Sequence, residues 1–151
     1  MPYSPLSAFR INARRLSVAL YDVAAWFLAT LALTGARYDF SLEAVQWEAT
    51  FQYAIWSSLV MVALGYSMGL YRGHFRIGSF QEAFRLATAV LAITLVVGVV
   101  FIIAVPSFPM GLALAVPPGA LLLMAAGRWM ARAAFERSLA PGAVATSEPT
   151  L

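Results

Sequence analysis

Cysteine and lysine are both missing from the 151-residue chain, and histidine occurs once. The lack of cysteine excludes disulfide bonds, cysteine-ligated zinc, iron–sulfur clusters and thiol nucleophiles. With one histidine, a histidine-based metal site is not expected, and we expect no cofactor in this chain. The glycine-rich loops of nucleotide-binding enzymes and the G-x-S-x-G sequence of hydrolases are also missing. The sequence therefore contains no catalytic motif, and it does not by itself decide whether the chain belongs to an enzyme.

Charged residues are scarce as well. They make up 11% of the chain, against 62% hydrophobic residues, and the mean hydropathy is +0.79. These values lie far outside the composition of soluble proteins, so the chain is predicted to be a membrane protein whose main partner is the lipid bilayer. The net charge of +3 comes from arginines placed beside apolar stretches. That pattern indicates membrane orientation and contact with anionic lipid, and not binding of nucleic acid.

Four apolar stretches predict an all-α membrane domain with four transmembrane helices, at about residues 16–34, 51–71, 84–105 and 111–130. A helix of about 20 residues rises ~1.5 Å per residue and crosses a hydrocarbon layer of ~30 Å. Pro117 and Pro118 should kink the last span and free carbonyl groups that need other partners. A cleaved signal peptide is the alternative for the first stretch, but the internal carboxylate of Asp22 argues against it.

The segments between these spans carry most of the charge. Asp39, Glu43 and Glu48 lie in residues 35–50, where we expect a short interfacial helix on the outer side, starting near Ser41. Residues 1–12 are predicted to be a loose or surface-lying lead. Residues 138–151 are predicted to be a disordered tail or truncated linker, which leaves 1–137 as the membrane domain.

Orientation follows from the arginines. Nine of the ten lie in the N-terminal lead, the central turn around residues 72–85 or the C-terminal flank, and Arg37 alone lies on the opposite side. Because positively charged flanks stay in the cytoplasm, both termini are expected there. Near the central turn, Ser79 and Glu82 have the spacing of a capping box, which predicts a helix start at about Phe80.

Asp22 is the one carboxylate inside a predicted span. A carboxylate at that depth costs at least ~2.5 kcal/mol unless it is paired or hydrated, so it should face the bundle interior. One interpretation is a proton or cation site. The other, which we favour, is a structural bond to Tyr21, Arg72, Arg128 or a helix-end amide.

Two further groups are candidate sites. Arg72, His74 and Arg76 form a basic corner that could bind a diphosphate or a polyprenyl phosphate head group through paired guanidinium donors. Orientation and contact with anionic lipid are the favoured interpretation. Gly65, Gly69 and Gly73 have a small-xxx-small spacing, which predicts helix packing within the bundle, with formation of a homo-oligomer as the alternative.

Three motifs carry a family resemblance: Leu20-Tyr21-Asp22; Gly69-Leu70-Tyr71-Arg72 followed by Phe75-Arg76 and Ser79; and an arginine-rich exit from the last span. Over about residues 14–137 the chain resembles the N-terminal membrane region of the polysaccharide-biosynthesis nucleoside-diphosphate-sugar epimerase/dehydratase family. A similar four-span region precedes the catalytic part of bacterial polyprenyl-phosphate sugar-1-phosphate transferases. In the dehydratase family the membrane region is followed by an NAD(P)-binding domain with a glycine-rich loop. This sequence stops at Leu151 before any such loop.

The resemblance therefore implies a membrane-anchoring role at the inner membrane of a bacterium, with a catalytic domain as partner, and not the dehydratase reaction itself. A small transporter or flippase-like protein that uses Asp22 is the alternative from another functional class. A sensor or assembly subunit without a ligand is the third.

Overall fold

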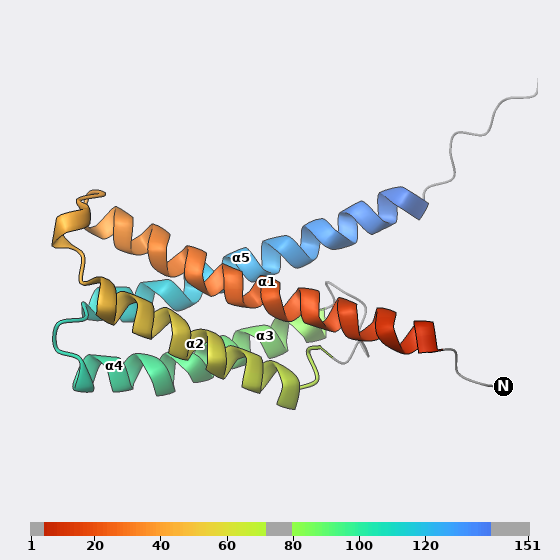
Figure 1. Ribbon diagram of the computed structural model, residues 1–151, viewed down its shortest axis with the longest axis horizontal. Coiled ribbons are helices and arrows are strands. Elements are labelled where there is room, and N and C mark those ends of the chain that lie inside the picture. The colour runs from red at the N-terminus through yellow and green to blue at the C-terminus, as the bar shows by residue number, and fades with distance from the viewer. Residues whose placement is uncertain (1–4, 72–79, 140–151) are drawn as a thin grey trace, which may run out of the picture.

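The computed structural model describes residues 5–71 and 80–139, which form helices joined by short connections (Figure 1). The helices in chain order are α1 (Pro5–Arg37), α2 (Trp47–Ser67), α3 (Phe80–Ile93), α4 (Val99–Ala104) and α5 (Met110–Leu139). A π-helical turn, η2 (Thr94–Gly98), joins α3 to α4 so that the three form one rod. The chain runs back and forth along the bundle, and the start of α1 and the end of α5 lie toward the same end.

Among the described residues, three helical segments are long and apolar enough to cross a membrane: Arg15–Arg37, Phe80–Ala104 and Met110–Ala134. The all-α membrane fold is thus confirmed, but the number of such segments is three and not the predicted four. The segment predicted at residues 51–71 is the exception. Its helix, α2, ends at Ser67 and contains glutamine, tyrosine, tryptophan and paired serines, which lower its hydropathy.

Two local predictions hold only in part. The predicted short helix near Ser41 is a single 3-10 turn, η1 (Leu42–Ala44), with Ser41 as its N-cap. The chain reverses just before it, where Asp39 and Phe40 have positive φ angles of 49° and 58°. The N-terminal lead, predicted to be loose or surface-lying, is helical from Pro5 onward and therefore not loose.

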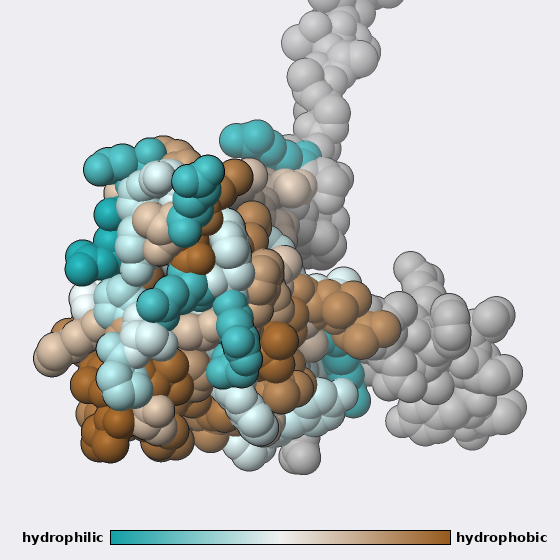
Figure 2. Space-filling model, turned by 60° about the vertical axis from the view of Figure 1, so that its left-hand side comes forward, coloured by the Kyte–Doolittle hydropathy of each residue, from teal (hydrophilic) through white to brown (hydrophobic). Residues whose placement is uncertain are grey.

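Figure 2 brings forward the end of the bundle that carries the connections at residues 38–46 and 105–109. Hydrophilic residues gather on this end, and hydrophobic surface continues along the sides of the helices. A polar end and apolar sides suit a bilayer, since lipid covers the sides and water reaches the end.

The double proline does not end α5, which continues through Pro117 and Pro118. Pro117 has no amide hydrogen to donate to the carbonyl of Ala113, four residues earlier. The hydroxyl of Tyr53, from α2, donates to that carbonyl at 3.1 Å. The prediction that a neighbouring helix would serve a freed carbonyl is therefore confirmed, and the partner is a side chain that the sequence did not single out.

The Tyr53 ring also contributes to the core. It stacks on Phe108 with 4.8 Å between ring centroids and meets Phe101 edge-on at 5.2 Å. The hydroxyl and the ring together fix α2 against α4 and α5 toward the end of the bundle that carries the connection at residues 105–109.

Glycines spaced eight residues apart let α5 approach α1. A Cβ on Gly119 would lie 3.1 Å from the Leu33 side chain, and one on Gly127 would overlap the Tyr21 ring. Gly111 faces Arg37 near the other end of the interface. These positions run in opposite directions along the two helices, as expected for an antiparallel pair in contact over much of its length.

Candidate functional site

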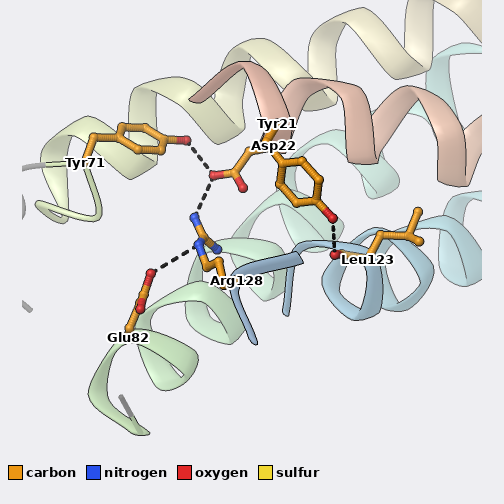
Figure 3. A network of polar contacts seen from close by, with 6 residues as sticks. All are labelled: Tyr21, Asp22, Tyr71, Glu82, Leu123 and Arg128. Atoms are coloured by element: carbon orange, nitrogen blue, oxygen red, sulfur yellow. Dashed lines mark hydrogen bonds and ion pairs between the residues drawn. The ribbon is translucent and has the colours of Figure 1, made fainter. Parts of the chain in front are cut away.

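Asp22, the carboxylate predicted inside the first span, is completely buried at 0% exposure on α1. Its Oδ2 accepts a hydrogen bond of 2.8 Å from Nη2 of Arg128 on α5 and one of 3.0 Å from the hydroxyl of Tyr71 (Figure 3). Arg128 was one of the partners predicted for this carboxylate. The structural interpretation of Asp22 thus has a definite geometry, in which the carboxylate is paired with an arginine and a phenol.

Arg128 also contacts a second carboxylate. Its Nε lies 3.1 Å from Oε1 of Glu82, in the first turn of α3, and the arginine itself is 7% exposed. One guanidinium group therefore lies between carboxylates from α1 and α3. We call Asp22, Tyr71, Glu82 and Arg128 the ion-pair network, which joins α1, the turn after α2, α3 and α5 at one level of the bundle.

Burial makes this network costly to break. Removing one partner of a buried ion pair leaves an uncompensated charge, and the loss is typically about 3–5 kcal/mol. Replacement of the whole pair by apolar groups is often far less harmful. The network consequently specifies how the helices are arranged more than it adds to the net free energy of folding.

Tyr71 reaches Asp22 because the chain reverses at the end of α2. The amide of Leu70 donates to the carbonyl of Gly65 at 2.9 Å, and that of Gly69 donates to Tyr66 at 3.3 Å. This pair of bonds is a Schellman motif, which needs a left-handed residue after the helix. Gly69 supplies it with a φ of 73°.

The reversal folds the Tyr71 ring back over α2, where a Cβ on Gly65 would overlap it. In this position the Tyr71 hydroxyl donates to Oδ2 of Asp22. The Tyr71 side chain is 3% exposed, so it belongs to the interior of the bundle.

The predicted glycine row is only partly present. Gly65 lies within α2, but Gly69 follows the last residue of that helix and terminates it instead of lining one of its faces. The third member, Gly73, lies outside the described residues, as do Arg72, His74 and Arg76 of the basic corner. The interpretations of these four residues stay predictions.

Tyr21 ties α1 to α5 beside the network. Its hydroxyl donates to the carbonyl of Leu123 at 2.7 Å, next to the space left by Gly127 (Figure 3). Asp22 and Tyr21 are adjacent in sequence and both contact α5. The two residues fix the crossing point of the two longest helices.

The chemistry of the network is that of a structural clamp. In residues 5–71 and 80–139, no three metal-ligating side chains lie close enough to hold an ion. Oδ1 of Asp22 and Nη1 of Arg128 are buried polar atoms without a hydrogen-bond partner in the structure.

Comparisons of the chain with protein-family models, with curated proteins and with solved structures found no match.

Proposed function

We propose that the chain is the membrane-anchoring module of a bacterial surface-polysaccharide biosynthesis protein, one that works with nucleotide sugars. Its role would be positional, holding a cytoplasmic enzyme at the inner face of the membrane. The observation that carries the proposal is the convergence of the motif residues. Asp22, Tyr71 and Arg128 come from three motifs that are far apart in sequence, and they meet in the ion-pair network. We therefore interpret the three motifs as the sequence signature of a bundle held together by this ion-pair network.

The arrangement of the ends supports an anchoring role. The start of α1 and the end of α5 lie at the same end of the bundle, where Arg128, Arg132 and Arg137 follow the last apolar stretch. By the positive-inside rule this end faces the cytoplasm. A catalytic domain joined to, or bound by, either end would lie at the inner membrane face.

This topology requires α2 to be a fourth span, and its geometry permits one. Its 21 residues extend for about 31 Å at ~1.5 Å per residue, enough to cross the hydrocarbon layer. Its one formal charge, Glu48, lies in the first turn. Ser57, Ser58 and Tyr53 are buried, so lipid does not have to accommodate them.

A transporter that uses Asp22 is the second candidate, and one observation favours it. Oδ1 of this buried carboxylate has no hydrogen-bond partner in the structure. Against it, Oδ2 is held by Arg128 and Tyr71, and a carboxylate paired with a permanent cation is a poor carrier of protons. The anchor remains the better-supported proposal.

The test uses the host bacterium. We expect deletion of the chain to lower surface polysaccharide and to shift a nucleotide-sugar enzyme from the membrane to the soluble fraction, both restored by the wild-type gene. Unchanged polysaccharide and unchanged enzyme distribution would contradict the anchor. Proton-coupled uptake by purified protein in liposomes that is lost with Asp22→Asn would favour the transporter instead.

A further inference from the structure

Three buried side chains at the level of the ion-pair network carry polar atoms that have no hydrogen-bond partner in the structure. These atoms are Oδ1 of Asp22, Nη1 of Arg128 and Nε1 of Trp26. Asp22 and Trp26 are 0% exposed, and Arg128 is 7% exposed. Buried polar groups of native proteins nearly always have a partner, either another protein group or an ordered water molecule. Unpartnered atoms of this kind therefore indicate a site for a small polar ligand.

The free atoms of Asp22 and Arg128 lie beside their ion pair. Nη2 of Arg128 contacts Oδ2 of Asp22 at 2.8 Å, whereas the second carboxylate oxygen carries no dashed line in Figure 3. Oδ1 shares a carbon atom with Oδ2, and Nη1 shares one with Nη2, so both free atoms lie next to that contact. A guanidinium group can pair with a carboxylate through two parallel bonds, but the second bond is not formed in this pair. An acceptor and a donor are thus left close together.

Trp26 brings another donor to the same region. It follows Asp22 by four residues on α1, and side chains with this spacing lie on one face of a helix, with about 5–6 Å between their Cβ atoms. That face of α1 is packed inside the bundle, since neither side chain is exposed. The site consequently combines an acceptor on Asp22 with donors from α1 and α5.

The ligand of this site has to donate to a carboxylate oxygen and accept from a guanidinium group. An anion such as chloride can only accept, so it would leave Oδ1 of Asp22 without a donor. A metal cation would pair with Oδ1 but would leave Nη1 and Nε1 without an acceptor. Water both donates and accepts, and a buried water typically makes about three hydrogen bonds. We propose that enclosed water binds between Asp22, Trp26 and Arg128, donating to Oδ1 and accepting from Nη1 and Nε1.

This water accounts for the unpartnered oxygen of Asp22 without a transport role. It gives the carboxylate a further hydrogen bond, so Arg128, Tyr71 and water together stabilise the charge inside the bundle. The water is enclosed, because Asp22 and Trp26 are 0% exposed. The site does not depend on the anchoring role, since it uses neither the chain ends nor a partner enzyme.

The test is X-ray radiolysis of the full chain in detergent micelles, with oxidised side chains identified by mass spectrometry of its peptides. X-rays split bound water where it lies, so the hydroxyl radicals oxidise the side chains that contact it. Photolysis of hydrogen peroxide forms the same radicals in bulk water instead. We expect Trp26 to be oxidised under X-rays but not by peroxide photolysis. Exposed Trp47 should be oxidised by both sources, and buried Phe101, whose ring packs against Tyr53 and Phe108, by neither.

A double substitution removes the site. Asp22→Leu with Arg128→Leu deletes both free atoms of the ion pair, so Trp26 should lose its oxidation under X-rays. The matched control is Arg132→Leu, at an exposed position one turn further along α5, which should leave the oxidation unchanged. Circular dichroism excludes a variant that fails to fold, and the wild-type comparison then decides alone. The proposal would be overturned by no oxidation of Trp26 under X-rays, by equal oxidation from bulk radicals, or by unchanged oxidation in the folded double variant.

Discussion

Asp22 and Arg128 are 106 positions apart in sequence and form an ion pair of 2.8 Å inside the bundle. The pair joins the first and last helices, and Tyr71 and Glu82 complete it from the two sides of the connection between α2 and α3. These three contacts link α1, α3, α5 and the turn after α2 at one level of the bundle.

The first prediction compares two substitutions of Asp22. Asp22→Leu leaves the Arg128 guanidinium buried without its carboxylate and should lower the free energy of unfolding by about 3–5 kcal/mol. Asp22→Asn keeps an oxygen that can accept from Arg128 and Tyr71, so its loss should be clearly smaller. Unfolding in detergent, followed by circular dichroism, measures both. Equal stability of the two variants would show that pairing does not determine the role of Asp22.

The second prediction concerns Gly65 and Tyr71. A methyl group at Gly65→Ala overlaps the Tyr71 ring, displaces its hydroxyl from Asp22 and should destabilise the protein by about 1–3 kcal/mol. The same change in a Tyr71→Ala background should cost little, because the ring is gone. Gly98→Ala is the control, since a Cβ there meets its neighbours at 3.6 Å or more. Equal losses from Gly65→Ala in both backgrounds would contradict the contact.

The third prediction tests the partner of the proline-freed carbonyl. Tyr53→Phe keeps the ring stacking but orphans the Ala113 carbonyl, at an expected cost of about 1–3 kcal/mol. Pro117→Ala supplies a backbone amide hydrogen that can donate to this carbonyl. In a double-mutant cycle, Tyr53→Phe should therefore cost less in the Pro117→Ala background. Additive losses would mean that the hydroxyl and the missing amide are unrelated.

Much of the fold could be predicted from hydrophobicity alone. The break between residues 104 and 110 follows from prolines, which act locally; the predicted cap at Ser79 lies outside the described residues. Phe40 is the contrary case. Its backbone is left-handed, at the chain reversal that precedes the 3-10 turn η1. A bulky residue rarely adopts this conformation, so the sequence does not predict it.

The candidate site was predictable only as a set of alternatives. The cost of burying Asp22 required a partner, and Arg128 was among those considered, but spacing along the chain cannot choose between partners 50 or 100 residues away. Tyr71 was missed because its position depends on the Schellman reversal at Gly69. That signal was present, since a glycine followed by an apolar residue is typical of a helix end. It was interpreted as part of a packing row instead.

The glycines at positions 111, 119 and 127 show the same difficulty. Their regular spacing is visible in the sequence, yet it predicts only that some helix approaches closely. The partner, α1, follows from the fold as a whole.

Topology is the most direct test of the central claim that the chain crosses the membrane four times and presents both ends to the cytoplasm. The natural chain has no cysteine, so single cysteines can be placed by Glu43→Cys, before α2, and Arg137→Cys, near the end of α5. A membrane-impermeant maleimide, applied to intact spheroplasts and to inverted vesicles, reports the side of each. We predict labelling of Glu43→Cys only from outside and of Arg137→Cys only in inverted vesicles. If α2 did not cross, both positions would be labelled from the same side, and that result would contradict the account.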